Sequence, residues 1–320
     1  MTEEPDISYL VAAYNAAPWI ESAIQSALDQ SDVRVEIIVA DDASTDQTLA
    51  IVQQMAEKDA RVVLIRRPIS GGPAAARNSA LTEARGKWIG ILDADDLLEP
   101  NRSRLLIDAA KHSGSVIIAD NLFCFTENNP DHGHCLLDEQ EPFFVNVAIY
   151  LRRNLVMGGP TNLGYLKPIV RRSLIIEHKL LYDERLRIGE DFNFCLRCMA
   201  VAPLLIWPEP LYRYRLRSGS ISRGLAPTDL EALIAAHVGV FNQPLTPLEY
   251  KANRAFLRAL RDLLTYVRFT HLLRRKAFMQ SFISATNPRI WRTVFVLARR
   301  KVAERRLRSP KIKQPHFKAN

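Results

Sequence analysis

Three carboxylates crowd the segment WIGILDADDLLEP, residues 88–100. Four of its first five residues are apolar and predict a buried strand, whereas Asp93, Asp95 and Asp96 follow at once. Carboxylates repel one another, and taking them out of water is costly unless they are paired or bind a metal. A D-x-D pattern after a strand suits Mg²⁺ or Mn²⁺, which take oxygen ligands and share them with phosphates. The segment therefore predicts a metal site at Asp95 and Asp93, beside a diphosphate.

Two other predicted strands also end in polar residues. The first ends at Tyr14 and Asn15, and the second ends at Asp41 and Asp42. Ligands of open α/β sheets bind beyond the carboxyl ends of the strands. We therefore expect the three clusters to line one crevice, and a nucleoside diphosphate fits a metal-bearing crevice. Neither a phosphate-binding loop with a Lys-Ser/Thr ending nor a G-x-G-x-x-G turn is present.

Apolar runs that alternate with helical patterns must position these clusters. The predicted strands are residues 7–15, 35–42, 61–67 and 87–96. The predicted helices between them are residues 18–28, 44–59 and 71–86, the second with Ser44 or Thr45 as its N-cap. The strands are continuously apolar, which is typical of a parallel sheet covered by helices on both faces.

A second acidic pair lies far along the chain. GEDFNFCLRCMA, residues 189–200, predicts a turn and then a helix, with Glu190 and Asp191 in the first turn. Anions are stabilised there by the helix dipole, so one reading is that both acids only cap the helix. The other reading is that these acids take part in catalysis. Arg77 is likewise either a cation fixed near the crevice or an ordinary arginine on a helix surface.

Four ordered blocks carry a family resemblance: AAYNAAPWIESAIQSALDQ, VEIIVADDASTDQT, GGPAAARNSALTEARGKWIGILDADD and GEDFNFCLR. They resemble family 2 glycosyltransferases with the GT-A fold, over roughly residues 5–220, and are most similar to bacterial exopolysaccharide enzymes of the succinoglycan type. The resemblance implies an α/β GT-A nucleotide-sugar-binding fold, with a mainly parallel sheet between helices and a helical C-terminal extension. We expect a glycosyltransferase domain over residues 1–225, with a donor half at about 5–120 and an acceptor half at about 121–225.

The resemblance also implies which residues hold the nucleotide sugar. Ala12, Tyr14 and Asn15 stand where the first strand of the family meets the base and ribose. Asp42 matches the acid that holds the edge of the base, and Arg77 lies in the family's Ala-Arg-Asn block near the nucleotide. The family often has a hydroxyl residue in place of Ala12, so we expect only backbone contacts there.

The remaining matches concern the reaction. Asp93 and Asp95 match the family's D-x-D, with Asp95 assigned to the metal and diphosphate. Asp191 matches the catalytic base, and Glu190 is its partner. The implied enzyme is a metal-dependent hexosyltransferase with Mg²⁺ or Mn²⁺ as cofactor. It would use a nucleotide sugar, and the usual donors of the family favour UDP as the nucleotide. A helix N-terminus weakens a base, so closeness to the acceptor must compensate for that placement.

The implied reaction transfers the sugar, with inversion, to a hydroxyl of a growing surface polysaccharide linked to a polyprenyl diphosphate. A single displacement inverts the anomeric carbon, and a retaining reaction would need a second positioned nucleophile. One alternative is a polyprenyl-phosphate sugar synthase, whose acceptor phosphate needs no base. Another is an inactive nucleotide-sugar-binding scaffold.

Two later segments are candidates for the acceptor side and the diphosphate. Residues 154–175 correspond to the variable acceptor region, and the turn at 158–160 is expected to shape its pocket. In YRYRLRSGSIS, residues 212–222, the residues Arg215, Ser220 and Ser222 are candidates for contact with the diphosphate.

The C-terminal part of the chain is strongly basic. Residues 251–320 hold 19 Lys and Arg against two acids, a net +17, whereas residues 1–250 carry −9 of the chain's overall +8. Helical stripes predict a basic helical region at 226–308, and residues 309–320 are expected to be disordered. The segment 288–308 combines Trp and Phe with dense Arg and Lys, as helices at a membrane interface do.

These features predict a cytoplasmic protein, peripheral on the inner face of the cell membrane. The start of the sequence lacks a signal-type pattern, and no window approaches 18 uninterrupted apolar residues. The four cysteines fit a reduced compartment. Alternatively, the C-terminal helices pack on the body or bind nucleic acid. Because no nucleic-acid-binding module is recognisable, we expect no nucleic-acid partner.

Overall fold

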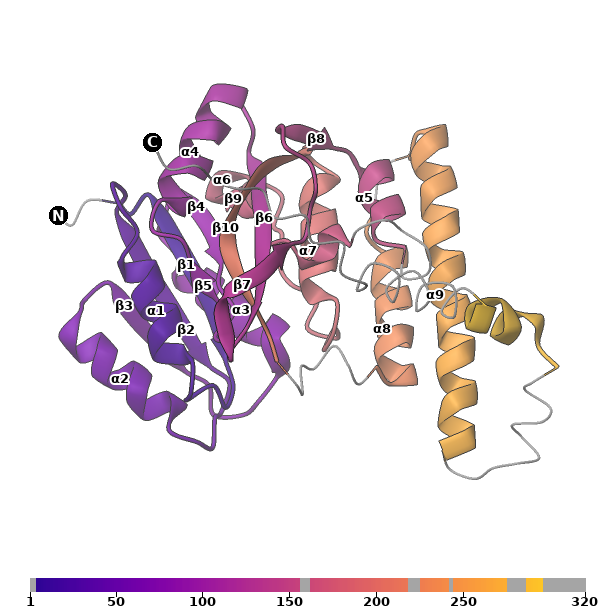
Figure 1. The fold of residues 1–320 in the computed structure, drawn as a ribbon, viewed down its shortest axis with the longest axis horizontal. Coiled ribbons are helices and arrows are strands. Elements are labelled where there is room, and N and C mark those ends of the chain that lie inside the picture. The colour runs from indigo at the N-terminus through magenta and orange to yellow at the C-terminus, as the bar shows by residue number, and fades with distance from the viewer. Residues whose placement is uncertain (1–3, 156–161, 218–224, 242–243, 275–285, 296–320) are drawn as a thin grey trace.

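The computed structural model describes residues 4–155, 162–217, 225–241, 244–274 and 286–295 (Figure 1). Strands and helices alternate in its N-terminal part. They run in the order β1 (Ile7–Ala13), α1 (Ile20–Leu28), β2 (Val35–Asp41), α2 (Thr48–Lys58), β3 (Val62–Arg66), α3 (Gly72–Glu83) and β4 (Trp88–Ile91). All seven residues of β2 are buried, as the continuous apolar pattern predicts.

Further strands and helices form the middle of the chain. They are β5 (Leu97–Leu98), α4 (Arg102–Ser113), β6 (Ile117–Thr126), β7 (Asn129–Cys135), β8 (Phe143–Val145), α5 (Val147–Arg153), the short 3₁₀ helix η1 (Leu163–Tyr165), β9 (Ile169–Arg171), α6 (Arg172–Glu177), α7 (Glu190–Met199) and β10 (Leu204–Leu216).

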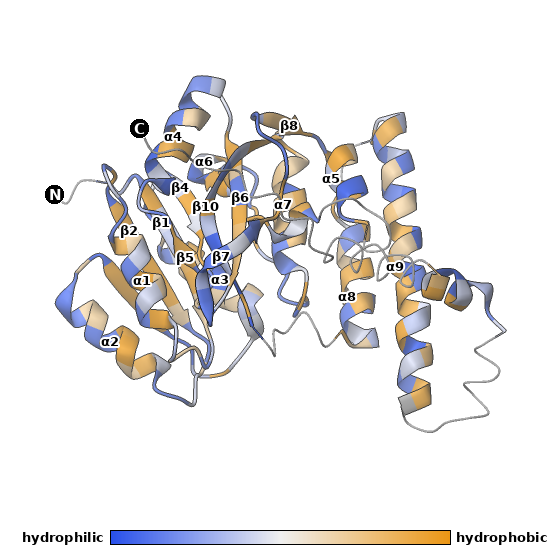
Figure 2. Cartoon of the chain, viewed as in Figure 1, coloured by the Kyte–Doolittle hydropathy of each residue, from blue (hydrophilic) through white to orange (hydrophobic). Residues whose placement is uncertain are grey.

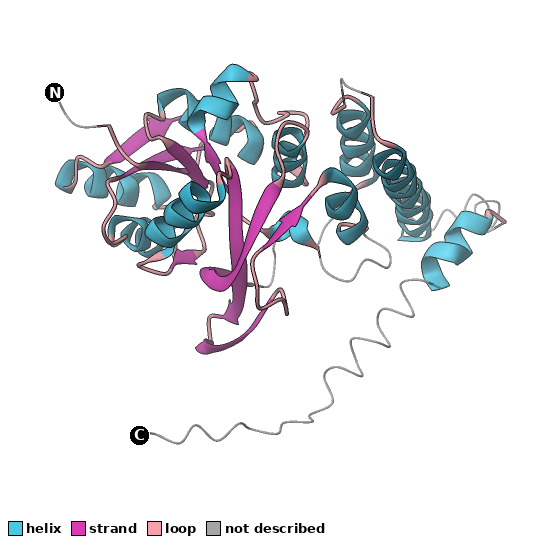
Figure 3. Cartoon of the chain, turned by 90° about the horizontal axis from the view of Figure 1, so that it is seen from above, coloured by secondary structure: helices cyan, strands magenta, loops and turns pink. Residues whose placement is uncertain are grey.

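One sheet joins both parts, with the main strand order β3-β2-β1-β4-β9-β6-β10-β5. β1 pairs in parallel with β2 and β4, and β2 pairs in parallel with β3. β9 is antiparallel to its neighbours β4 and β6, whereas β6 and β10 are parallel. Helices cover both faces (Figure 3). The expected mainly parallel α/β sheet is therefore confirmed.

The carboxyl ends of β1 and β2 lie side by side, because Ala13 pairs with Asp41 in the parallel register. One detail of the prediction here was wrong. α2 begins at Thr48, and neither Ser44 nor Thr45 is its N-cap. Instead, Ser44 accepts a hydrogen bond of 3.0 Å from the backbone of Asn15, and the Thr45 backbone donates one of 2.8 Å to the Asn15 side chain. These hydroxyl-bearing residues tie two strand ends together.

Two helices follow the sheet, α8 (Pro227–Val238) and α9 (Pro247–Arg274), and residues 288–295 are also helical. Hydrophobic residues gather in the strands and along faces of α8 and α9 (Figure 2). Phe256, Leu260 and Leu263 of α9 are buried in the main core. The alternative that the C-terminal helices pack on the body is therefore confirmed for α9. Within the described residues, no helix is both long and apolar enough to cross a membrane.

Candidate active site

The acids of the D-x-D segment meet two cations at the carboxyl end of β4. Asp93 accepts a hydrogen bond of 2.7 Å from Nη2 of Arg77, which lies on α3. Its other oxygen lies 2.7 Å from Nζ of Lys167, in the segment that leads into β9. Arg77 and Lys167 are 4% and 6% exposed, so both charges are removed from bulk water and need acidic partners.

The second acidic pair reaches the same cations. α7 begins after Gly189, which has a φ of 82° and places Glu190 and Asp191 in the first turn. Glu190 accepts a hydrogen bond of 2.7 Å from Nη1 of Arg77, and Oδ2 of Asp191 accepts one of 2.7 Å from Lys167. The two side chains therefore turn to cations on other elements, and no side chain caps this helix.

One oxygen of Asp191 is left without a hydrogen bond. Nη1 of Arg77 lies 3.0 Å from Oδ1 of Asp191, yet this buried oxygen accepts no hydrogen bond because the geometry is unsuitable. Buried polar atoms usually have a partner, and a catalytic role is one of the reasons for an exception. Asp191 thus has one oxygen hydrogen-bonded to Lys167 and one buried oxygen that faces Arg77 without a hydrogen bond.

The charges in this cluster explain the ionisation of its members. Burial disfavours the charged form of Asp93, but Lys167 and Arg77 outweigh it and lower the pKa of Asp93 to about 2. Burial and the charge of Asp191 raise the pKa of Glu190, against the effect of Arg77. Burial would lower the pKa of Lys167, but Asp191 and Asp93 raise it well above its usual value. The cluster is thus an ion network of three acids and two cations.

Asp95 pairs with a different cation, Arg217, which lies just beyond the end of β10. The Arg217 guanidinium also lies 4.6 Å from the centre of the Trp19 ring. Burial, and then the charge of Asp93, raise the pKa of Asp95, while Arg217 opposes the shift. A buried carboxylate next to a second acid attracts a cation, and here Arg217 provides one.

The residues around Asp95 fit a divalent cation that is bound mainly by phosphate and water. Among the described residues, no group of three or more His, Cys, Asp or Glu side chains is arranged as a metal site. Mg²⁺ commonly takes only one or two protein carboxylates and completes its shell with substrate phosphates. Asp95 could supply such a ligand by exchanging Arg217 for the metal. Asp93 would first have to leave Lys167.

Asp96 is a structural residue of this segment. It is 1% exposed and accepts hydrogen bonds from the Tyr212 hydroxyl at 2.9 Å and from the Arg215 backbone at 2.7 Å. The Arg215 side chain donates to the Asp95 carbonyl at 2.7 Å. The end of β10 therefore fixes the backbone of the D-x-D segment. Arg215 has this role here, whereas Ser220, Ser222 and the turn at 158–160 lie outside the described residues.

The predicted nucleotide end of the site surrounds Asn15, which has a φ of 49°. Asn is one of the few residues that adopt this left-handed conformation readily. Tyr14, its neighbour, is 54% exposed, while Ala12 lies opposite Ala40 in the sheet and is partly buried. The structure therefore places an exposed aromatic ring at the end of β1, where the sequence predicts the base and ribose.

Asp42 does not present a free carboxylate. Its oxygens accept hydrogen bonds from Arg67 at 2.8 Å, Ser70 at 2.7 Å, and the backbones of Gly71 at 3.0 Å and Gly72 at 2.8 Å. It thereby holds the loop that starts α3. Its neighbour Asp41 is different, because Oδ1 of Asp41 is buried without a hydrogen-bond partner. Asp41 is thus a second acidic candidate for the base edge.

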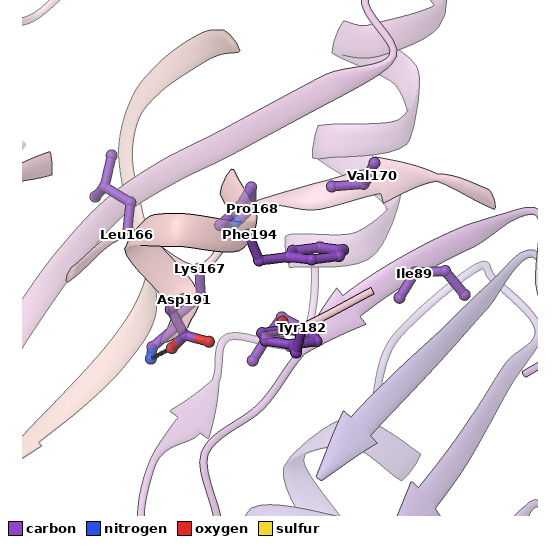
Figure 4. Close-up of a pocket in the computed structure, with 9 residues that line it drawn as sticks. Ile89, Leu166, Lys167, Pro168, Val170, Tyr182, Asp191 and Phe194 are labelled. Atoms are coloured by element: carbon purple, nitrogen blue, oxygen red, sulfur yellow. Dashed lines mark hydrogen bonds and ion pairs between the residues drawn. The ribbon is translucent and has the colours of Figure 1, made fainter. Parts of the chain in front are cut away.

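A small cavity of about 10 Å³ lies beside Lys167 and Asp191 (Figure 4). It holds at most one water molecule, so it is too small for a sugar. A larger hollow of about 830 Å³ includes Asp6 and Trp88, at the starts of β1 and β4. It therefore lies at the opposite edge of the sheet from the acidic cluster.

Sequence reasoning missed Lys167 and Arg217 as site residues, and it placed Asp41 at the crevice without giving it a role. For Lys167 a signal existed, because a lysine within the apolar run YLKPIV must find a carboxylate once the run is buried. Arg217 carries no comparable signal, and Asp41 is marked only as the first acid of a pair at a strand end. Their importance depends on contacts that only the folded chain reveals.

Comparison with known proteins agrees with this architecture. Residues 8–174 match the family described as glycosyl transferase family 2. The chain is 35% identical over 280 residues to succinoglycan biosynthesis protein ExoO of Rhizobium meliloti (strain 1021), covering 85% of this chain and 79% of ExoO. It is 30% identical over 283 residues to ExoU of the same organism, covering 87% of this chain and 82% of ExoU.

Solved structures show the same fold. S. aureus TarS 1–349 in complex with UDP-GlcNAc aligns with a TM-score of 0.61 at 19% identity, covering 86% of this chain and 89% of TarS 1–349. The mannosyltransferase PcManGT from Pyrobaculum calidifontis, in complex with GDP-Man and Mn²⁺, aligns with a TM-score of 0.54 at 20% identity, covering 97% of this chain and 89% of that one. The fold is therefore that of a GT-A glycosyltransferase. The chain belongs to glycosyltransferase family 2.

Proposed function

We propose that this enzyme moves a sugar, with inversion, from a UDP-sugar to a hydroxyl of a growing surface polysaccharide. The observation that carries the proposal is the position of Asp191, whose Oδ1 is buried without a hydrogen bond, next to the D-x-D residue Asp93. The similarity to succinoglycan biosynthesis proteins supports a polysaccharide product. The UDP and UDP-GlcNAc complexes of TarS support a UDP-linked donor.

In the proposed reaction the acceptor oxygen attacks C1 of the sugar, and the bond from C1 to the diphosphate oxygen breaks. Asp191 takes the acceptor proton as general base. Lys167 and Arg77 face its two oxygens, at 2.7 Å and 3.0 Å respectively. A single displacement inverts C1. Glu190, the other acid of the pair, is hydrogen-bonded to Arg77, and we propose no nucleophilic role for it.

Asp95 is the proposed metal ligand, and a bound Mg²⁺ or Mn²⁺ would neutralise charge on the leaving diphosphate. The Mn²⁺ complex of PcManGT supports this cofactor. Asp41, Asn15 and Tyr14 are proposed to surround the base and ribose. Arg77 is proposed to act on the acids rather than on the nucleotide, because its guanidinium is ion-paired with Asp93, Glu190 and Asp191.

The acceptor is proposed to be linked to a polyprenyl diphosphate, with the enzyme held on the inner face of the cell membrane. Ile290 of the helix at 288–295 packs inward at 1% exposure, whereas Trp291 and Phe295 are each 60% exposed. Exposed aromatic residues beside Arg289 and Arg292 suit an anionic lipid surface.

A thermal-shift panel tests the donor assignment. Wild-type protein is heated with UDP-glucose, UDP-GlcNAc or GDP-mannose, each with Mn²⁺ or with EDTA. A ligand at 100 times its Kd stabilises the folded state by about 2.7 kcal/mol, which gives a clear rise in Tm. We expect a UDP-sugar to raise Tm only with Mn²⁺. Stabilisation by GDP-mannose alone would contradict the UDP assignment, and equal shifts in EDTA would contradict the metal assignment.

A further inference from the structure

We propose that Lys167 is a positioning residue, which holds the general base Asp191 and the D-x-D residue Asp93 at a fixed separation. This inference rests on the proposed function. It concerns a residue outside both acidic motifs.

The geometry places one ammonium group between two acids from different elements. Nζ of Lys167 lies 2.7 Å from Oδ2 of Asp93 and 2.7 Å from Oδ2 of Asp191. Asp93 follows β4 in the donor half, and Asp191 belongs to α7 in the acceptor half. Figure 4 shows the Lys167 and Asp191 side chains directed toward each other beside the small cavity. Lys167 therefore joins the two halves of the site through its charge.

The backbone of Lys167 is anchored as firmly as its side chain. Its carbonyl accepts a hydrogen bond of 2.6 Å from Nη2 of Arg102. The same nitrogen lies 2.7 Å from Asp120, and both side chains of this pair are fully buried. A buried pair with well-formed hydrogen bonds is rigid, because breaking it leaves an uncompensated charge. The Asp120–Arg102 pair thus fixes the point from which the Lys167 side chain extends.

The contact also determines which oxygen of Asp191 remains reactive. Lys167 donates to Oδ2, whereas Oδ1 lies 3.0 Å from Arg77 and accepts no hydrogen bond. Without the ammonium group of Lys167, Arg77 would be left as the cation shared by the three acids Asp93, Glu190 and Asp191. Their repulsion would move or rotate Asp191, and a displacement of about 1 Å can cost about a hundredfold in rate. Asp93 would keep its hydrogen bond from Arg77, so donor binding should change little.

A double-mutant cycle tests this role. Four proteins are compared: wild type, Lys167→Met, Asp191→Asn, and the double variant. The double variant loses one cation and one acid and so preserves the net charge of the cluster. Each is assayed for UDP release from UDP-glucose or UDP-GlcNAc with Mn²⁺, where water replaces the acceptor, attacks C1 and gives its proton to the base. The Kd of the donor is measured by titration on the same samples.

The proposal expects Lys167→Met to lower kcat by about tenfold or more, with the donor Kd changed by less than about threefold. In the Asp191→Asn background, Lys167→Met should change kcat by less than about twofold, because Lys167 acts through Asp191. If Lys167 had a purely structural role, Lys167→Met would lower kcat by a similar factor in both backgrounds, or it would weaken donor binding and lower Tm. Either result overturns the proposal, as does full kcat in Lys167→Met.

Three further comparisons keep the outcomes separate. If Lys167→Met does not fold, the double variant is compared with Asp191→Asn alone, and a much lower kcat of the double variant rejects the proposal. If wild type binds the donors but Asp191→Asn retains full kcat, the proposed base fails and Lys167 has nothing to position. If wild type neither binds nor cleaves a UDP-sugar, the proposed function itself is wrong.

Discussion

Phe256 of α9 stacks on Phe192 of α7, with ring centroids 5.1 Å apart and ring planes 24° apart. Phe192 directly follows Asp191 in the sequence and also stacks on Tyr150, with centroids 5.3 Å apart. The C-terminal helices therefore support the helix that carries the proposed base. This contact gives the extension a structural role that is independent of any membrane.

The first prediction follows from this stack. Phe256→Ala should lower the free energy of unfolding by about 3–5 kcal/mol, because it leaves a cavity in the core. It should also reduce transfer more than donor binding, because the lost contact lies behind Asp191 and not beside the nucleotide end. Urea unfolding, a sugar-transfer assay and donor titration measure these effects. Tyr250→Ala, at a position 56% exposed on the same helix, is the matched control and should change neither. An unchanged stability of Phe256→Ala would reject the packing account.

The second prediction separates two neighbouring acids. Asp42→Ala should destabilise the protein by about 2 kcal/mol, because the Arg67, Gly71 and Gly72 donors lose a charged acceptor. Asp41→Asn should instead weaken UDP binding and leave Tm nearly unchanged. Thermal unfolding and UDP titration decide between them. A loss of UDP affinity on Asp42→Ala at unchanged Tm would favour the first assignment, Asp42 at the base.

The third prediction concerns the ion pair between Asp95 and Arg217. If a metal must displace Arg217, then Arg217→Ala should bind Mn²⁺ more tightly without nucleotide, by up to about tenfold. Because Arg217 lies over Trp19, Mn²⁺ should also alter Trp19 fluorescence in the wild type. The Trp19→Phe protein is the control for the other tryptophans. Weaker Mn²⁺ binding by Arg217→Ala would show that Arg217 supports the metal rather than competing with it.

The fourth prediction tests the basic end of the chain. Removing residues 296–320 deletes nine Lys and Arg and one acid and leaves the described core untouched. The full chain should pellet with anionic vesicles at low salt, and the shortened chain should remain largely in the supernatant. Neutral vesicles are the control. Equal partition of both proteins contradicts membrane attachment through this segment, and stronger retention on RNA or DNA than on vesicles would favour the nucleic-acid alternative.

The sequence predicts the fold well because its signals are local. Continuous apolar runs and helical periodicity identify β1 to β4 and α1 to α3, and the parallel arrangement follows from their alternation. The clustering of Asp93 with Asp191 follows from the rule that ligands bind at strand ends and from the family resemblance. The helical spacing of the apolar residues in α9 also predicts that one face of this helix is buried. It does not predict which part of the core that face contacts.

The specific contacts were not predictable, because they join residues distant in sequence. Nothing local indicates that Asp42 is saturated by the loop before α3 while Asp41 keeps an oxygen without a partner. Arg77 reads as a nucleotide contact from its motif, yet its position on α3 directs it into three acids. A charge pattern shows which residues need partners, and only the fold shows which partners they obtain.

The most direct test of the central claim is donor binding and sugar transfer by Asp191→Asn. This substitution keeps the size of the side chain and removes its basicity. The account predicts a normal Kd for the UDP-sugar, a Tm close to that of wild type, and transfer reduced by about 10²–10⁴-fold. Near-normal transfer by Asp191→Asn, with transfer lost in Glu190→Gln, would assign the base to the other acid. Full activity of both variants would contradict general-base catalysis and favour a phosphate acceptor.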